Sequence, residues 1–332
     1  MREKLSDQHV LLTGGAGFIG SHVAEALLRR DATLTIVDDL DDFYSPAWKK
    51  ANLEEVLRAG DFHFLQADIS DPSALRHLFD ETGFDILIHL AARAGVRPSV
   101  EHPSLYERIN VAGTLNLLEL CREFGFSKVL FGSSSSVYGV SSHVPFSEAQ
   151  ADLKPISPYA ATKLAGELLC YTYAHLYDLP VICLRFFTVY GPRQRPDLAI
   201  HKFTSQIESG KPIRLYGDGS SGRDYTYVDD IVAGVLAALE YFPLTGNAPF
   251  EVFNLGNSHP VKLAEMVEAL ERATSRTAIC VHEPNQPGDV PLTWADISKA
   301  SRLLNYKPAT SLDEGLGRFV SWYRATSAFR RA

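Results

Sequence analysis

The chain has 332 residues, of which 45% are hydrophobic and 22% charged, and its 32 Lys and Arg residues against 40 Asp and Glu residues give a net charge of −8. This balance is typical of a globular protein in water, and an acidic chain lacks the clustered basic charge on which general binding to nucleic acid or anionic membranes depends. No apolar run reaches the roughly 20 residues of a membrane-spanning helix, so we expect a cytoplasmic protein with neither nucleic acid nor a membrane as partner.

The first half of the chain alternates between short apolar runs and longer segments with apolar residues at helical spacing. The short runs predict buried strands, and the longer segments predict helices between them. Alternation of this kind is typical of a parallel sheet covered by helices on both faces, so the expected fold class is α/β with a doubly wound sheet. The predicted strands are 10–13, 34–37, 62–66, 86–90, 129–133 and 181–186, and the predicted helices are 22–30, 105–124 and 159–177.

The composition of the chain changes after residue 190. Gly, Pro and Asp become denser there, and the predicted helices are separated by long loops. One helical segment, 229–240, is apolar enough to pack back on the first half. We therefore expect a large domain at 1–188 with 224–256 packing back on it, and a smaller lobe built from 189–223 and 257–332.

A glycine-rich turn follows the first predicted strand. Gly14, Gly17 and Gly20 fit the spacing G-x-x-G-x-x-G, which lets the backbone approach a pyrophosphate while a helix N-terminus offers it unpaired N–H groups. A tight structural turn is the alternative. Asp38 ends the second strand 38 − 20 = 18 residues later, where a carboxylate can accept both adenosine ribose hydroxyls and repel a 2′-phosphate. Together these features predict dinucleotide binding, with NAD favoured over NADP.

Tyr159 and Lys163 are four residues apart, on the same face of a predicted helix. A phenol titrates near ~10, so a nearby cation is needed before it can act as a base near neutral pH. This spacing also occurs by chance on surface helices, and the prediction therefore depends on context. Four consecutive serines, 133–136, end a predicted strand at the sheet edge where doubly wound folds bind ligands. A turn built on serine hydroxyls would explain one or two of them but not their position.

The cysteines and the histidine of the fourth strand carry no predicted chemistry. The four cysteines are far apart, lie in apolar surroundings and show no C-x-x-C spacing, so we expect buried thiols in a reducing compartment. His89 is interpreted as a core histidine. No residues have the spacing of metal ligands, and no metal is predicted. The cysteines are Cys121, Cys170, Cys183 and Cys280.

In its whole set of motifs the chain resembles the extended short-chain dehydrogenases/reductases, and among them the NAD-dependent nucleotide-sugar 4-epimerases. The resemblance runs from residue 10 to about 322 and rests on TGGAGFIGSH, SSSSVYG, YAATK, LRFFTVYGP, GRDYTYVDD and QPGDVPLTWAD in the family's order. It implies a Rossmann-type NAD-binding domain, a UDP-sugar-binding lobe and a homodimer. It also implies that Ser134, Tyr159 and Lys163 are catalytic, Ser134 being the serine four residues before the Val-Tyr-Gly tyrosine.

The resemblance further implies the residues that hold the two ligands. Arg223 matches an arginine on the diphosphate of the substrate, Asp289 matches an acceptor for its ribose, and Asn110 matches a structural amide near the site. The implied cofactor residues are Gly14, Gly17, Phe18, Ile19, Gly20, Asp38, Asp68, Ile69, Leu90, Ala91 and Ala92, with Tyr159 and Lys163. The implied substrate residues are Arg97, Ser135, Ser136, Thr188, Arg195, Arg214, Tyr216, Arg223, Gln286 and Asp289.

Three segments, 41–53, 94–97 and 191–197, resemble UDP-glucuronate 4-epimerases in particular. Gln286 stands where the epimerases of neutral hexoses have arginine, and Thr293 stands where they have tyrosine. A C5 carboxylate needs donors, which Ser135, Ser136 and Thr188 supply as neutral groups and Arg195 and Arg97 as charged groups. The expected reaction is 4-epimerisation of UDP-glucuronate through a transient 4-keto sugar.

Other reactions stay open at this point. A 4-epimerase of neutral or N-acetylated UDP-hexoses shares all the catalytic motifs, and a UDP-glucuronate decarboxylase shares the 4-keto intermediate. A net dehydrogenase and a non-catalytic dinucleotide-binding regulator are further alternatives. Dehydration at C4 and C6 is not expected, since relatives with that activity carry Asp-Glu in place of Ser135 and Ser136.

Overall fold

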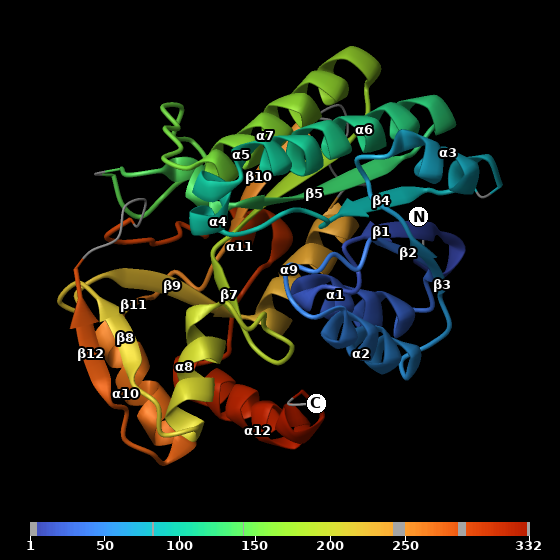
Figure 1. Cartoon of the computed structure of the whole chain (residues 1–332). Coiled ribbons are helices and arrows are strands. Elements are labelled where there is room, and N and C mark those ends of the chain that lie inside the picture. The colour runs from blue at the N-terminus through green and yellow to red at the C-terminus, as the bar shows by residue number, and fades with distance from the viewer. Residues whose placement is uncertain (1–4, 82, 142, 242–249, 285–289, 331–332) are drawn as a thin grey trace.

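Seven parallel strands form the central sheet of the computed structural model, which describes residues 5–81, 83–141, 143–241, 250–284 and 290–330 (Figure 1). The sheet grows in both directions from its first strand, and the predicted doubly wound α/β fold is confirmed. All six predicted strands are present within two residues of their expected ends. The spatial order is β10 (Phe250–Leu255), β6 (Val181–Phe186), β5 (Lys128–Ser134), β4 (Ile86–His89), β1 (His9–Thr13), β2 (Thr33–Asp38) and β3 (His63–Gln66).

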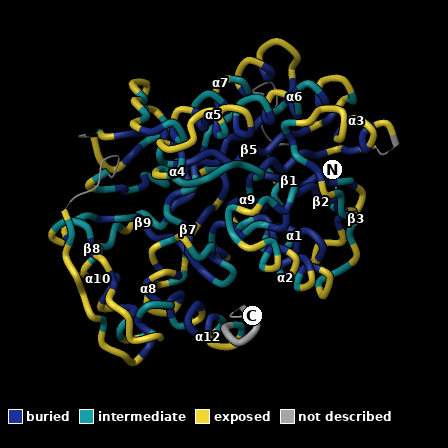
Figure 2. Tube along the Cα trace, in the orientation of Figure 1, coloured by how far each residue is buried: buried dark blue, intermediate teal, exposed yellow. Residues whose placement is uncertain are grey.

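Two layers of helices cover the sheet, and its inner strands are buried almost throughout, whereas the edge strand β3 and the first half of β10 are only partly covered (Figure 2). In β1, Val10 and Leu12 contact one hydrophobic cluster and Leu11 contacts the other, because successive side chains point to opposite faces. This explains why the strands are apolar at consecutive positions. One layer holds α1 (Phe18–Leu28), α2 (Pro46–Leu57), α9 (Val228–Tyr241) and α11 (Ser298–Leu304); the other holds α3 (Pro72–Glu81), α4 (Val96–Glu101), α5 (Pro103–Glu107), α6 (Gly113–Phe124) and α7 (Pro158–Tyr177).

The single helix predicted at 105–124 is wrong in one respect. A π-helical turn, η2 (Arg108–Ala112), separates α5 from α6. It carries Asn110, whose Oδ1 accepts a hydrogen bond from the Arg93 backbone N–H at 2.7 Å and whose Nδ2 donates to the Arg93 carbonyl and to Thr162 Oγ1, both at 3.0 Å. Turns of this kind recur at functional sites, and here the turn ties the segment after β4 to α7.

The smaller lobe lies at lower left in Figure 1 and contains two short sheets. Its helices α8, α10 and α12 pack beside these sheets, while β10 and α9 belong to the central sheet and its helical layer. The sheets are β11 (Pro260–Lys262), β9 (Gly222–Tyr227) and β7 (Thr188–Tyr190), and β12 (Cys280–Glu283) with β8 (Ile213–Tyr216); the helices are α8 (Ala199–Glu208), α10 (Leu263–Thr274) and α12 (Leu312–Arg330). Single turns of 3-10 helix lie at η1 (Leu5–Asp7) and η3 (Ser135–Tyr138).

The cysteines are not all buried. Cys121, Cys170 and Cys183 are buried as expected, but Cys280 is exposed. It lies on β12, whose only strand partner in the described part of the chain is β8, so its neighbours Ile279 and Val281 are also exposed. An apolar surrounding sequence therefore does not ensure burial at the edge of a two-stranded ribbon. Among the helices that the structure describes, none is both long and apolar enough to cross a membrane.

Candidate active site

A cleft of about 940 Å³ opens at the carboxyl edge of the central sheet and is lined by residues of both lobes. Every predicted site residue within the described ranges lines this cleft, from the glycine turn after β1 to Arg214, Tyr216 and Arg223 in the smaller lobe. Gln286 and Asp289 lie outside the described residues. The cleft therefore brings together side chains that are more than 200 residues apart in the sequence.

The glycine turn lies between the carboxyl ends of β1 and β4. This is the point in the sheet from which successive strands are added in opposite directions. Gly14 has a positive φ of 75°, and a Cβ atom there would lie 2.6 Å from the backbone nitrogen of Ala91. A Cβ at Gly20 would lie 2.1 Å from the Gly14 carbonyl oxygen. Gly17, the N-cap of α1, offers no side-chain cap, so the first N–H groups of the helix are left for another acceptor. This cradle fits the pyrophosphate of a dinucleotide.

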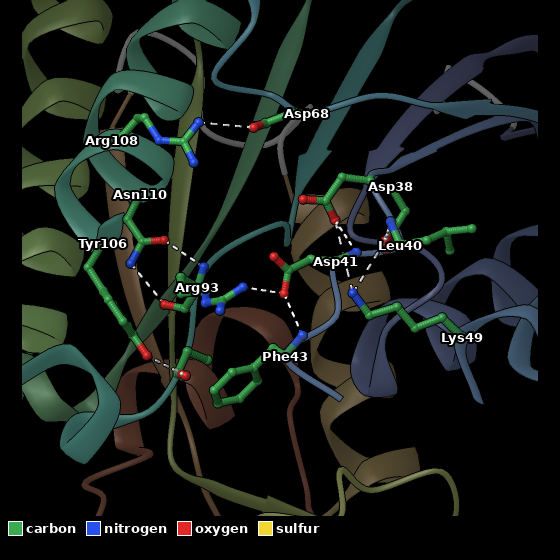
Figure 3. A network of polar contacts seen from close by, with 12 residues as sticks. Asp38, Leu40, Asp41, Phe43, Lys49, Asp68, Arg93, Tyr106, Arg108 and Asn110 are labelled. Atoms are coloured by element: carbon green, nitrogen blue, oxygen red, sulfur yellow. Dashed lines mark hydrogen bonds and ion pairs between the residues drawn. The ribbon is translucent and has the colours of Figure 1, made fainter. Parts of the chain in front are cut away.

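Asp38 lies at the end of β2, beside Leu40 and Lys49 (Figure 3). Both of its carboxylate oxygens accept hydrogen bonds. Oδ2 accepts from the Ala16 backbone N–H at 3.1 Å and Oδ1 from the Leu40 backbone N–H at 2.9 Å, which leaves one lone pair on each oxygen for a ribose hydroxyl. Burial raises the pKa of Asp38, and the ammonium of Lys49, 3.9 Å away, partly opposes this. The carboxylate is therefore held in place, with a cation beside it, before any ligand binds.

Sequence reasoning missed Lys49. The sequence does contain a sign of its burial, because Lys49, Asn52, Leu53 and Val56 recur at the spacing of one helical face. All four are buried in α2. A lysine on an inward-facing stripe needs a partner. Here the partners are the carboxylates of Asp38 and Asp39, at 3.9 Å and 4.0 Å.

The loop between β2 and α2 lines the cleft; the resemblance singled out 41–53, but no contact of its residues was predicted. The Asp41 carboxylate pairs with the Arg93 guanidinium and accepts a hydrogen bond from the Phe43 backbone N–H at 2.7 Å (Figure 3). The Phe43 ring lies 4.9 Å from the guanidinium carbon of Arg93 and 5.3 Å from that of Arg195. The loop thereby connects the cofactor side of the cleft to Arg195 on the substrate side through cation–π contacts.

The three residues implied to be catalytic meet at the carboxyl end of β5. Ser157 caps α7 by accepting a hydrogen bond from the Ala160 N–H at 3.2 Å, which places Tyr159 in the first turn and Lys163 in the second. Lys163 Nζ donates to the Gly132 carbonyl at 2.6 Å. The Ser134 hydroxyl donates to Ser136 Oγ at 3.1 Å and accepts from the Ser136 N–H at 3.2 Å. Strand end and helix start are thus fixed relative to each other.

Burial makes both titrating groups harder to ionise. It raises the pKa of Tyr159, against which a hydrogen bond from Ser134 and the charge of Arg195 act. It lowers the pKa of Lys163 to about 8, with Glu167 among the groups that oppose this. A phenolate at Tyr159 therefore depends on nearby positive charge, and Lys163 carries that charge only below about pH 8. The pair is suited to accept and return one proton.

Charged side chains also line the substrate side. Arg195 donates from Nε and Nη2 to the two carboxylate oxygens of Asp197, at 3.0 and 2.8 Å, and Asp197 was not predicted. The Arg97 guanidinium lies 4.6 Å from the Tyr216 ring, so α4 and β8 meet across the cleft. Arg214 is largely exposed, 3.6 Å from Glu283. Arg223 donates to the Gly222 carbonyl at 2.9 Å, and Thr188 begins β7.

His89 is a core histidine, as predicted. Its Nδ1 and Nε2 atoms lie 2.8 Å and 3.0 Å from the hydroxyls of Thr13 and Thr114. Burial lowers the pKa of His89 to about 3, so the ring is neutral at physiological pH. Within the part of the chain that the structure describes, no cluster of three His, Cys, Asp or Glu side chains is able to hold a metal ion.

Comparison with known proteins places these features in context. The model of the NAD dependent epimerase/dehydratase family matches residues 10–256. A UDP-glucuronate 4-epimerase from Thermodesulfobacterium geofontis is 46% identical over 318 residues, 95% of each chain. A UDP-glucuronic acid 4-epimerase from Bacillus cereus, in complex with UDP-glucuronic acid and NAD, is similar with a TM-score of 0.87 and 38% identity over 96% of this chain and 99% of that one. A UDP-glucose 4-epimerase from Thermotoga maritima, with UDP-glucose, has a TM-score of 0.86 and 33% identity over the same shares.

The first prediction concerns Asp38 and the adenosine ribose. Asp38→Asn keeps the shape of the side chain but removes its charge, and Lys49 then faces the cofactor site without that counter-ion. We expect NAD⁺ to bind about tenfold to a hundredfold more weakly, while NADP⁺ binds more tightly than to the wild type. Calorimetric titration of the cofactor-free protein with each dinucleotide measures both constants.

The matched control is Asp39→Asn. Its carboxylate lies 4.0 Å from the same lysine but is more exposed than that of Asp38. This variant should keep the wild-type preference for NAD⁺. An unchanged preference in Asp38→Asn would show that another residue selects the cofactor.

Proposed function

Because the chain belongs to the NAD dependent epimerase/dehydratase family, we propose that it interconverts UDP-glucuronate and UDP-galacturonate by NAD-dependent 4-epimerisation. The observation that carries the choice of sugar is the position of Arg195. Its guanidinium lines the cleft and acts electrostatically on the phenol of Tyr159. A cation beside the base that serves C4 is suited to the carboxylate on the neighbouring ring carbon, C5.

The chain's own residues supply the proton chemistry. The Tyr159 phenolate takes the proton of the C4 hydroxyl, Ser134 orients that oxygen, and Lys163 stabilises the negative charge on the phenol. NAD, when bound, supplies the acceptor for the C4 hydride and the donor that returns it. The same tyrosine then gives its proton back to the C4 oxygen, so base and acid are one residue. We infer that the domain built on the central sheet holds NAD, whereas the smaller lobe, to which β9 belongs, holds the UDP-sugar.

Inversion requires the transient 4-keto sugar to present its opposite face. Arg223 is proposed to hold the diphosphate, since a guanidinium binds phosphate oxygens in bidentate fashion. Asp289 stays the predicted acceptor for the uridine ribose. Anchored through UDP, the sugar ring is free to turn about its link to the diphosphate. Return of the hydride to the other face inverts C4.

The acidic sugar sets a further demand, because its 4-keto form is a β-keto acid that loses carbon dioxide readily. The carboxylate must be held in an orientation that disfavours this cleavage. Thr188, Ser135 and Ser136 offer hydroxyl donors in the cleft, and Arg195 offers charge. Epimerisation instead of decarboxylation depends on these donors.

A second candidate is 4-epimerisation of neutral UDP-hexoses. The specific observation in its favour is the bidentate pairing of Arg195 with Asp197. Because this pair is neutral as a whole, a neutral sugar would not leave a buried cation unpaired. The two candidates differ in whether the sugar carboxylate replaces or joins Asp197 on the guanidinium.

The decisive assay incubates the protein separately with UDP-glucuronate, UDP-glucose and UDP-N-acetylglucosamine and resolves the 4-epimers by chromatography. We expect turnover of the acid. Arg195→Ala should lower kcat/KM for UDP-glucuronate about tenfold to a hundredfold, since a hydrogen bond between charged groups is lost, and Thr188→Val should lower it less. Both variants should affect neutral sugars more weakly than the acid.

Arg223→Ala is the control for this assay, because it removes a contact to the diphosphate that all three substrates share. It should lower kcat/KM for acidic and neutral sugars by similar factors. Turnover of a neutral sugar with none of the acid would refute the substrate while leaving the epimerase chemistry intact. Release of carbon dioxide from UDP-glucuronate would identify a decarboxylase.

A separate prediction tests the base. Tyr159→Phe should abolish turnover and leave NAD⁺ bound, because it removes only the group that accepts the proton. In the wild type, kcat/KM should fall as the pH rises through about 8, where Lys163 loses its proton. Tyr106→Phe is the control, since its ring centroid lies 6.3 Å from that of Tyr159 and its hydroxyl donates only to the Ala94 carbonyl. Substantial activity in Tyr159→Phe would mean that another base operates.

We also propose a homodimer built on α6 and α7. These neighbouring helices expose large apolar side chains, which is costly on a monomer surface. We expect light scattering to give twice the chain mass of 36.7 kDa, and the double substitution Leu168→Glu with Leu176→Glu to give the monomer. Leu57→Glu, on α2, changes a similarly exposed leucine elsewhere and should stay dimeric. The exposed residues are Leu115, Leu168, Tyr171, Leu176 and Tyr177.

A further inference from the structure

A buried ion pair that the mechanism above does not use lies behind the catalytic residues. Glu167 in α7 and Arg185 in β6 have side chains that are only 5% and 4% exposed. Arg185 donates from Nε to Oε1 at 2.9 Å and from Nη2 to Oε2 at 2.7 Å, the bidentate geometry of a strong pair. The Ser133 hydroxyl also donates to Glu167 Oε1. Removing two charges from water costs free energy that their mutual attraction does not always recover. We therefore ask what this pair does for the site.

The pair connects α7, which carries Tyr159 and Lys163, to β5, which ends at Ser134, and to β6, which carries Arg185. Glu167 lies one helical turn after Lys163 on α7, so the two side chains share a face. Ser133 directly precedes Ser134, and in the sheet Ser133 of β5 lies opposite Arg185 of β6. Three residues further along the chain from Arg185 comes Thr188. A shift of the pair would therefore move the base, the serine and the proposed sugar contact relative to one another.

The pair also sets the charge balance around the Lys163 ammonium. Cys170 and Glu167 act on this group from its own helix, Cys183 acts on it from β6, and the group itself acts on His89 of β4. Arg185 reaches it only through Glu167. His89 is neutral, and burial raises the pKa of Cys183 far above its usual range, so the thiol stays protonated. Tyr138 lies over the Arg185 guanidinium at 4.8 Å, and Arg195 faces Tyr159 from the cleft.

Of these groups, Glu167 is the carboxylate that acts on Lys163 directly, and Arg185 is held to that carboxylate by two hydrogen bonds. Burial opposes the charge of Arg185, but the hydrogen bonds and charge of Glu167 outweigh it and raise its pKa. Guanidinium and carboxylate together carry no net charge. Loss of either partner would leave one uncompensated charge beside the ammonium, in a region from which water is largely excluded.

We propose that Glu167 and Arg185 are positioning residues that fix Lys163 and Ser134 around Tyr159 and keep the lysine ammonium charged during epimerisation. This inference rests on the proposed function of Tyr159 and Lys163. It assigns the pair no contact with substrate or cofactor. Its effect is exerted through the helix, the two strand ends and the local charge.

The test uses two substitutions that remove opposite charges. Glu167→Gln leaves Arg185 unpaired and should move the high-pH limb of kcat/KM toward acid by about one pH unit, whereas Arg185→Gln leaves Glu167 unpaired and should move it toward alkali by a similar amount. Loss of packing alone would lower kcat in both variants without opposite shifts. Ser133→Ala is the uncharged control, since it removes a hydrogen bond to Glu167 but should leave the limb in place.

A second readout does not depend on turnover. Competitive acetylation over a pH series, quantified by mass spectrometry on the peptide that contains Lys163, reports the titration of that amine directly. It should shift in the same directions as the kinetic limb. If the wild type turns over no UDP-sugar, this titration still tests the charge effect, so failure of the proposed function and failure of the inference are distinguishable.

Glu167→Asp covers the case in which Glu167→Gln does not fold. It keeps the charge but draws the carboxylate back by one methylene, so the shift toward acid should be smaller and in the same direction. Circular dichroism identifies the folded variants. Wild-type titration of Lys163 in Glu167→Asp and Arg185→Gln would overturn the inference.

Discussion

The buried ammonium of Lys163 is the charge on which the rest of the site depends. A phenol in a partly buried position is a poor base, because burial raises its pKa. The lysine that corrects this is subject to the same penalty, and its pKa falls to about 8. The site therefore has to stabilise a cation in order to stabilise an anion. The hydrogen bond to the Gly132 carbonyl and the contact with the Phe131 ring, 5.0 Å away, are the direct means.

Charged side chains around the cleft are paired, some of them buried and some partly exposed. Asp38 is paired with Lys49, Asp41 with Arg93, Arg195 with Asp197 and Glu167 with Arg185. Each pair fixes a segment that a ligand must meet, because a charge left alone in such surroundings costs several kcal/mol in order of magnitude. The cleft is thus preorganised in the electrostatic sense before a ligand enters.

Sequence reasoning predicted the central sheet, the glycine turn with Asp38, the serine cluster and the Tyr159–Lys163 pair from local patterns, whereas the other residues that line the cleft were implied by the resemblance to a family. Apolar runs of strand length give the sheet, and the carboxyl ends of its strands must meet at one edge. It missed Lys49, Arg93 and Asp197, whose importance lies in partners on other elements. It also missed the π-helical turn at 108–112, since a helical period does not reveal one inserted residue. Burial of Cys280 was wrong because an edge ribbon has no covering layer.

The choice of sugar illustrates why the fold alone does not define the function. Solved structures of a UDP-glucuronic acid epimerase and a UDP-glucose epimerase resemble this chain almost equally, with TM-scores of 0.87 and 0.86. The difference must therefore lie in side chains, and Arg195 is the charged candidate next to the base. Asp197 already occupies two of its donors, so under the proposed function a sugar carboxylate would either replace Asp197 or join it on the remaining donors. Selectivity for the acid over a neutral sugar then depends on how the two carboxylates share the guanidinium, which makes Asp197 a proposed determinant of specificity beside Arg195.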